Sequence, residues 1–213
     1  QFQLIRTKLR VAGYENPRQV LADFQRFHGK SGGKTAVERY EFALLRDAGK
    51  DYTGAQQVMQ QLHRGDPDRL AYRLALGRIY RNAGELAAAA DIYQSSLELY
   101  PGETTVVLPY ASTLMAAGRN KEAHTLLARS SNADPENPKV YKLLAQSAGK
   151  NGLTLQTHTA MAEYYYLNGY TRQAVEQMKL AEKSPNLTDY EAARIAARLA
   201  TLKQEMENDE SRK

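Results

Sequence analysis

Three glycines recur at a fixed spacing and constrain the fold of this chain more than any other feature. The interval from Gly84 to Gly118 equals the interval from Gly118 to Gly152. Its length, about 34 residues, is typical of solenoid proteins, in which each repeat buries its apolar face only by stacking on the next repeat. We therefore predict an array of helical hairpins. Each glycine should end the first helix of its pair, where a left-handed residue costs least.

The residues around these glycines also recur. One repeat carries Leu76, Gly77, Tyr80, Ala89, Tyr93 and Pro101, and the next carries Tyr110, Ala111, Leu114, Ala123, Leu127 and Pro135. Small residues are needed where two helices cross closely, and larger residues fill the space between hairpins. Proline cannot continue a helix and separates the repeats. The pattern resembles the tetratricopeptide repeat (TPR) family, which implies an all-α solenoid, a right-handed superhelix of helical hairpins.

Two irregularities interrupt the period. Gly49, in an upstream repeat, precedes Gly84 by one residue more than the period, so the phase of the first helix of that repeat is left open. The interval from Gly152 to Gly169 is only half a period. Residues 155–168 therefore take the place of a second helix and also resemble the first helix of a new repeat. We interpret this part as a break in register, where a degenerate repeat leads into a final one.

The pattern divides the chain into four parts. We expect lead-in helices and a loop in 1–34, about four TPR repeats in 35–187, a C-terminal capping helix in 188–207 and a disordered tail in 208–213. The terminal hairpins of an array have only one neighbour, so both ends should carry capping helices. Apolar stripes support these helices: Phe2, Ile5 and Leu9; Val20, Phe24 and Phe27; and Ile195, Leu199, Leu202 and Met206. Thr35 with Glu38, and Thr188 with Glu191, have the spacing of capping boxes.

Motifs for catalysis or cofactor binding are missing from the sequence. Residues 29–35 end in Gly-Lys-Thr, but the position that a P-loop requires to be glycine, counted back from Gly33, is His28. The histidines never fall at the i, i+4 spacing of a metal-binding helix, and no HExxH motif occurs. Cysteine is absent. We expect no catalytic residue, no metal and no cofactor in this chain, which is therefore predicted to be a binding scaffold and not an enzyme.

Net charge and hydropathy limit the classes of partner that the chain is expected to bind. The net charge of +5 favours an acidic partner, but the basic residues are spread along the chain, so nucleic acid is only a weak third alternative. Apolar stretches such as 86–90 are far too short to span a bilayer. The chain starts at Gln1 without a signal-type segment, and we interpret it as a piece of a longer protein.

The inward-facing positions of TPR first helices define an expected binding wall. They map to Leu74, Arg78, Arg81 and Asn82, then Leu108, Ser112, Met115 and Ala116, then Lys142, Gln146 and Lys150, and finally Tyr166. Basic groups beside apolar ones suit an acidic or carboxylate-bearing polypeptide, because arginine holds carboxylates bidentately and methionine adapts its shape. The alternative is that these charges are only solvated. Tyr164, Tyr165 and Tyr166 cannot form one stacking platform, because neighbours on a helix point about 100° apart.

The C-terminal part of the sequence resembles a narrower family. Residues 162–169 (AEYYYLNG), Gln173-Ala174, Tyr190 and 193–199 (ARIAARL) are similar to the C-terminal TPR domain of the periplasmic β-barrel assembly-enhancing proteases. This resemblance implies a periplasmic location and a peptidase part elsewhere, with an HExxH zinc site. It also implies that the repeats engage the outer-membrane β-barrel assembly machinery, its substrates, or the peptidase domain itself. No catalytic or zinc residue carries over to this chain.

A second interpretation remains open. The chain could be a general TPR adaptor, unrelated to proteolysis, that binds a peptide or partner protein in its concave groove. The identity of the ligand, the oligomeric state, the activity of any parent peptidase and the role of segment 29–34 are not determined by the sequence.

Overall fold

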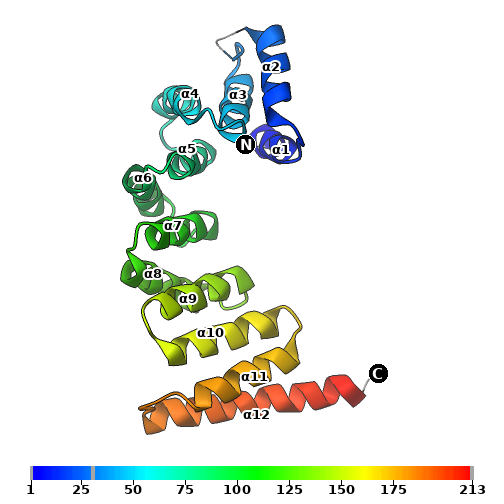
Figure 1. Ribbon diagram of the computed structural model, residues 1–213, viewed down its shortest axis with the longest axis vertical. Coiled ribbons are helices and arrows are strands. Elements are labelled where there is room, and N and C mark those ends of the chain that lie inside the picture. The colour runs from blue at the N-terminus through cyan, green and yellow to red at the C-terminus, as the bar shows by residue number, and fades with distance from the viewer. Residues whose placement is uncertain (1, 30–31, 212–213) are drawn as a thin grey trace. The chain divides into compact units, whose positions relative to one another are not determined.

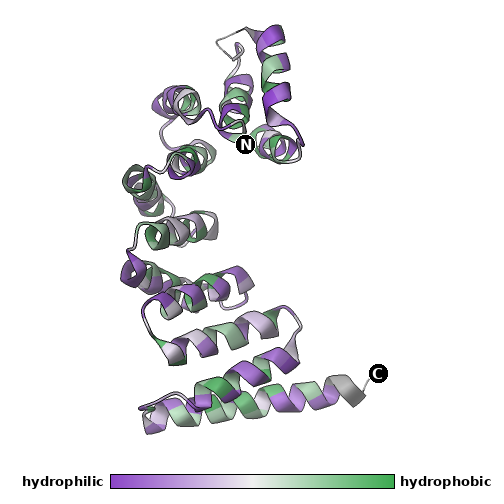
Figure 2. Cartoon of the chain, in the orientation of Figure 1, coloured by the Kyte–Doolittle hydropathy of each residue, from purple (hydrophilic) through white to green (hydrophobic). Residues whose placement is uncertain are grey.

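Every regular element in the described part of the chain is an α-helix, which confirms the predicted all-α fold. The computed structural model describes residues 2–29 and 32–211 (Figure 1). The chain forms two compact units, residues 1–113 and 114–213, and the boundary between them falls inside helix α7 (Thr104–Ala116). Figure 2 shows hydrophobic and hydrophilic segments alternating along the helices, as expected for amphipathic helices that bury one face.

The first unit is built from the helices that precede α7. They are α1 (Phe2–Ala12), α2 (Pro17–His28), α3 (Ala36–Ala48), α4 (Tyr52–Gly65), α5 (Leu70–Asn82) and α6 (Leu86–Leu99). Helices α3, α4, α5 and α6 pack in succession, while α1 and α2 both pack on α3. The capping box of Thr35 and Glu38 is present, and Asn16 caps α2 by accepting from the Gln19 backbone N–H at 3.2 Å. Residues 2–28 thus form two helices, as the sequence predicts.

The second unit is built from the helices that follow α7. They are α8 (Asn120–Ala133), α9 (Pro138–Lys150), α10 (Thr154–Leu167), α11 (Thr171–Glu182) and α12 (Asp189–Ser211). Each packs on the next. Asn137 caps α9 ahead of Pro138, and Thr188 with Glu191 forms the hydrogen bonds of a capping box before α12. None of the helices in the described ranges is long and apolar enough to cross a bilayer.

Residues with a left-handed backbone recur at the same period, and their spacing is more regular than the spacing of the glycines. Gly84, Gly118 and Gly152 have φ values of 84°, 76° and 71°. Lys50, with φ 68°, lies one period before Gly84, and Asn186, with φ 58°, lies one period after Gly152. The phase of the first repeat, which the sequence leaves open, is therefore regular. Gly49 has a φ of −77°, and Lys50 takes the left-handed conformation instead.

The helix starts follow the same period through α10. Helices α3, α5, α7 and α9 begin at residues 36, 70, 104 and 138, and α4, α6, α8 and α10 begin at 52, 86, 120 and 154. Helix α10 thus begins in register as the second helix of the hairpin that α9 starts, the place that the sequence predicts for residues 155–168. It packs on α11 as well as on α9.

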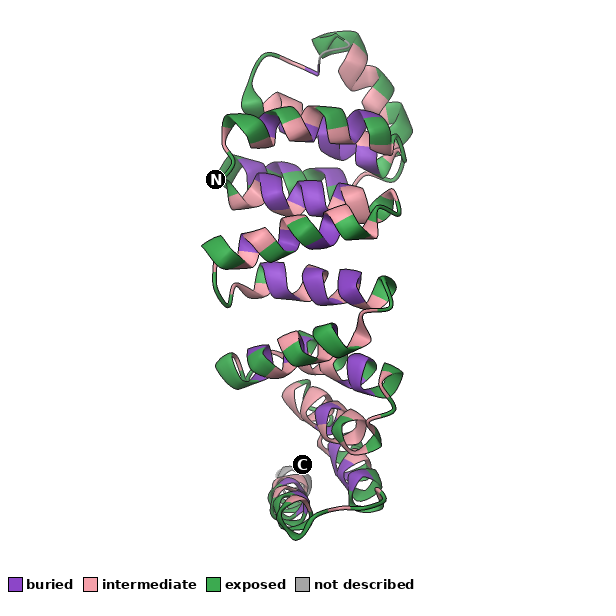
Figure 3. Cartoon of the chain, turned by 90° about the vertical axis from the view of Figure 1, so that its left-hand side faces the viewer, coloured by how far each residue is buried: buried purple, intermediate pink, exposed green. Residues whose placement is uncertain are grey.

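Close helix crossings explain the small residues of the repeat. Ala55, Ala89 and Ala123 are fully buried. A Cβ atom added to Gly77 would lie 2.7 Å from the Tyr93 ring, so this position of α5 accepts no side chain without displacing α6. Figure 3 shows buried residues alternating with intermediate and exposed ones along the helices. In the first unit the buried residues include Tyr40, Leu44, Met59, Leu76 and Ile79.

The C-terminal helix closes the second unit as an apolar cap. Ile195, Leu199 and Leu202 of α12 are at most 6% exposed and pack with Ala162 of α10 and Met178 of α11. The disordered tail was predicted to begin at residue 208, but α12 continues to Ser211, because no glycine or proline interrupts residues 189–211. Residues 212–213 lie outside the described part.

The N-terminal helix does not bury the stripe that its sequence suggests. Leu4, Thr7 and Val11 are its buried residues, whereas Phe2, Ile5 and Leu9 are 77%, 51% and 68% exposed. The side of α1 that contacts α3 is thus set by the shape of α3 and not by the most apolar stripe of α1. A row of large apolar side chains is left facing outward.

The left-handed position of Lys50 generates a stability prediction. Replacing Lys50 by glycine should raise the free energy of unfolding by about 1 kcal/mol, because a residue with a Cβ atom is strained at positive φ. Urea unfolding followed by circular dichroism measures the change. The matched variant is Gly84→Ala at the equivalent position, which should destabilise by a similar amount. Equal midpoints for all three proteins would contradict the conformational equivalence of the two positions.

Candidate interaction groove

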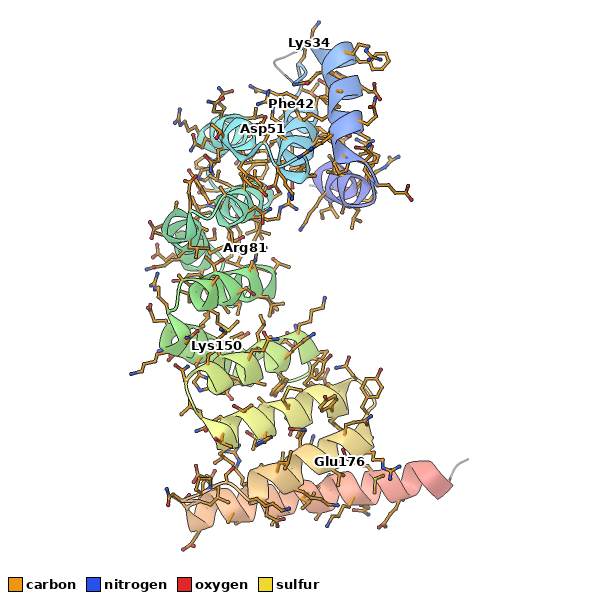
Figure 4. All side chains as sticks on the ribbon, in the orientation of Figure 1. Lys34, Phe42, Asp51, Arg81, Lys150 and Glu176 are labelled. Atoms are coloured by element: carbon orange, nitrogen blue, oxygen red, sulfur yellow. The ribbon has the colours of Figure 1, made fainter. Side chains whose placement is uncertain are left out.

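The first unit contains a groove between α1 and α5. It has a volume of about 450 Å³. One wall is α1, through Ile5, Lys8 and Leu9, and the other is α5, through Leu74, Arg78 and Arg81. Figure 4 shows the side chains of both helices, with Arg81 labelled. We call this feature the α1–α5 groove.

The floor of the groove is built from buried tyrosines. Tyr40 of α3 and Tyr93 of α6 are 2% and 1% exposed, and burial raises the pKa of each to about 12. Both rings therefore stay neutral at any physiological pH. The walls above them combine half-buried and exposed apolar side chains with three basic ones, so the groove is amphipathic.

The basic groups of the groove differ in how they are paired. Arg78 Nη2 lies 3.1 Å from Asp47 Oδ2, and Asn82 Nδ2 donates to Asp47 Oδ1 at 2.9 Å. Both oxygens of this buried carboxylate are therefore occupied. Within the described residues, neither Lys8 nor Arg81 has an acidic group at ion-pair distance. The pKa of Lys8 is lowered, first by partial burial of its ammonium group and then by the charge of Arg78.

The structure brings together three of the predicted wall residues in this groove. They are Leu74, Arg78 and Arg81. Asn82 follows on α5 but is exposed, and its amide is bound to Asp47. Ser112 is half-buried, and its hydroxyl donates to the Leu108 carbonyl at 2.9 Å within α7, so this hydroxyl already has a partner.

The remaining predicted residues lie in the second unit. Met115 is half-buried near the end of α7. Lys142, Gln146 and Lys150 are exposed and follow one another at one-turn spacing, so they share one face of α9. Lys142 Nζ lies 5.7 Å from the centroid of the Tyr164 ring, a cation–π contact, and Lys150 is labelled in Figure 4. The cavity of the second unit described below does not include these three side chains.

Tyr166, the last predicted wall residue, is covered by α12. Its hydroxyl donates to Glu205 at 3.3 Å, and the Arg198 guanidinium lies 4.5 Å from the ring centroid. Arg198 also donates to both oxygens of Glu163, at 2.8 and 2.7 Å. The pKa of Tyr166 is raised, chiefly by its hydrogen bond to Glu205. Tyr166 therefore belongs to the attachment of the C-terminal helix.

A second cavity, of about 660 Å³, lies in the second unit between α8, α9, α10 and α12. Its charged residues balance, because Glu163 and Glu191 face Arg194 and Arg198. His124 also lines it, and burial lowers the pKa of this imidazole. Among the residues that the structure describes, no group of three His, Cys, Asp or Glu side chains is placed to hold a metal ion.

The sequence reasoning missed the contribution of α1. Ile5, Lys8 and Leu9 line the groove, but they precede the repeats, so the TPR positions do not reach them. The apolar stripe of α1 is visible in the sequence and predicts a helix there. It does not indicate that this helix lines a binding groove.

Comparisons with known proteins agree with this architecture. Residues 82–147 match the model of the tetratricopeptide repeat family. Among solved structures, MamA from Desulfovibrio magneticus RS-1 is similar with a TM-score of 0.58 and 15% identity, over 82% of this chain and 98% of that chain. YrrB, described as a TPR protein with an unusual peptide-binding site, has a TM-score of 0.57 and 14% identity, over 83% and 90%. The chain thus has a TPR fold, in which helical hairpins stack on one another.

One relative is more specific. The β-barrel assembly-enhancing protease of Yersinia pestis is 27% identical over 165 residues, which cover 78% of this chain. The match spans only 34% of the length of that protease.

The buried carboxylate beneath the groove generates a stability prediction. Asp47→Asn should lower the free energy of unfolding by about 2 kcal/mol, because it removes a charge-assisted partner of Arg78 inside the protein. Thermal unfolding checks this. Asp91→Asn, on the exposed side of α6, is the matched control and should leave the melting temperature unchanged. Equal melting temperatures for both variants would show that the Asp47 pair contributes no stability.

The attachment of α12 generates a second stability prediction. Arg198→Gln should destabilise the protein by about 1–2 kcal/mol, because both hydrogen bonds to Glu163 and the contact with Tyr166 are lost. Arg194→Gln makes the same change one turn earlier, at an exposed position, and should have little effect. Urea unfolding compares the two. Equal midpoints would contradict a role for the Arg198 cluster in holding α12.

Proposed function

We propose that this chain is the protein-binding arm of a larger protein similar to the β-barrel assembly-enhancing protease of Yersinia pestis. The observation that carries the binding role is the α1–α5 groove. In it, exposed apolar side chains face one cavity together with basic ones that have no acidic partner among the described residues. A surface of this kind is energetically unfavourable in water unless a partner covers it. The groove requires no catalytic group, and the proposed role is engagement of a partner.

The similarity to the protease supports a narrower proposal. In it, the repeats engage the outer-membrane β-barrel assembly machinery or its unfolded substrates in the periplasm. Proteolysis, together with the zinc that it requires, belongs to a peptidase part outside this chain. The resemblance of residues 162–169 and 193–199 lies at α10 and α12, which form the Glu163–Arg198 contact. This contact attaches the C-terminal helix α12 to α10, so the residues that carry the resemblance also hold the cap of the array.

A general adaptor role is the second candidate. It is favoured by the similarity of fold to YrrB, a TPR protein with an unusual peptide-binding site. In this case the groove would bind one defined partner with no connection to barrel assembly.

Site-specific photocrosslinking in Gram-negative cells distinguishes the two. A photoreactive amino acid at Leu9 or Leu74 should capture a component of the barrel assembly machinery or a barrel precursor, identified by mass spectrometry. The control position is Arg64, which is exposed on α4 away from the groove. Capture of a defined partner unrelated to barrel assembly would support the adaptor instead. If the groove positions capture no more than Arg64 does, the binding role of the groove is wrong.

A further inference from the structure

We propose that the α1–α5 groove recognises acidic polypeptide segments, in which side-chain carboxylates alternate with large apolar residues. The carboxylates would be held by Lys8 and Arg81 beside Arg78, and the apolar residues would cover Ile5 and Leu9. This inference rests on the proposed binding function and names the chemical class of the partner and the residues that select it.

The charge balance of the groove supports an anionic ligand. Of the three basic side chains, only Arg78 has an acidic partner within the described ranges, the buried Asp47. Both oxygens of Asp47 are already bound, so it has little capacity for the other two cations. Glu103, the acidic residue among those lining the groove, accepts both hydrogen bonds of Thr105 through Oε1 and forms no ion pair with the three cations within the described ranges. Lys8 and Arg81 are therefore unmatched cations in one cavity.

The electrostatics of Lys8 favour an anion between Lys8 and Arg78, which both line the groove. The Lys8 ammonium is partly desolvated and repelled by Arg78, and both effects lower its pKa. A carboxylate between the two side chains would compensate both effects, because opposite charge favours the protonated amine.

The apolar wall selects polypeptide over other anions. Ile5 and Leu9 are 51% and 68% exposed at the groove, and Phe2 continues the same stripe at 77%. Nucleic acid would place a hydrated phosphate backbone against these side chains, which gains nothing from an aliphatic surface. Alternating acidic and apolar side chains instead match both the cations and the apolar wall. Arginine is also among the residue types that are enriched at protein interfaces.

Peptide selection on the complete chain provides the probe. A naive library of displayed peptides of about twelve residues is panned on the wild-type protein at low salt. One enriched peptide is then synthesised with an amidated C-terminus, so that only side chains supply carboxylates, and its Kd is measured by fluorescence anisotropy. We expect enrichment of Asp or Glu next to Leu, Ile or Phe, and weaker binding at higher salt, because exposed charges are screened.

Charge reversal tests the assigned residues. Arg81→Glu and Lys8→Glu should each raise the Kd about tenfold or more, since a charge-assisted contact becomes a repulsion. Arg64→Glu makes the same charge change on α4 and should leave the Kd unchanged. A peptide with lysine in place of its acidic residues should bind Arg81→Glu better than wild type. Circular dichroism confirms that each variant is folded.

A matched pair of variants tests the apolar half of the groove. Leu9→Ser should weaken binding of the same peptide, whereas Leu180→Ser, at an exposed leucine of α11, should not. Selected peptides without acidic residues, no selected peptide at all, or equal effects of Arg81→Glu and Arg64→Glu would overturn the inference. The scaffold function would survive those results if photocrosslinking at Leu9 or Leu74 captures a partner. It fails separately if that crosslinking captures nothing above the control.

Discussion

The close crossing of neighbouring helices is the constraint on which the rest of the structure depends. Where α5 meets α6, the Tyr93 ring lies so near the Gly77 backbone that even a methyl group would collide with it. Ala89 in the same repeat, and Ala55 and Ala123 in the neighbouring repeats, meet the same requirement. Because interiors are close-packed, this contact fixes the separation of the two helices. The constant period follows, since each hairpin must present the same surfaces to the next.

A regular array still needs ends, and the two ends of this chain solve the problem differently. At the C-terminus, α12 buries Ile195, Leu199 and Leu202, and Arg198 is held by Glu163 and Tyr166. At the N-terminus, α1 contacts α3 through Leu4 and Val11 but leaves Ile5 and Leu9 outside. One end is therefore a closed cap, whereas the other adds a wall to a groove. In that groove, exposed apolar surface lies beside basic groups that have no acidic partner in the described part of the chain.

How far the sequence predicts this protein depends on the range of the interactions involved. The capping box at Thr35 and the stop at Gly84 arise within a few residues, and both were predictable. The repeat positions also located Leu74, Arg78 and Arg81 on one face of α5. Tyr166 is a residue for which the repeat positions give the wrong surroundings. Its repeat position predicts an inward-facing side chain, but Glu205 of α12 accepts a hydrogen bond from its hydroxyl. A repeat pattern contains no information about a helix that follows the repeats.

The sequence by itself determined the helices, their constant period and the positions where backbones cross, because glycine, alanine and proline act through local sterics. Only the tertiary structure decided that Lys50 and not Gly49 is left-handed and that Asp47 pairs with Arg78. It also decided that α1 completes the groove. The physical reason is that these features depend on which surfaces fit together across the fold, and side-chain complementarity at long range leaves no periodic signal in a single sequence.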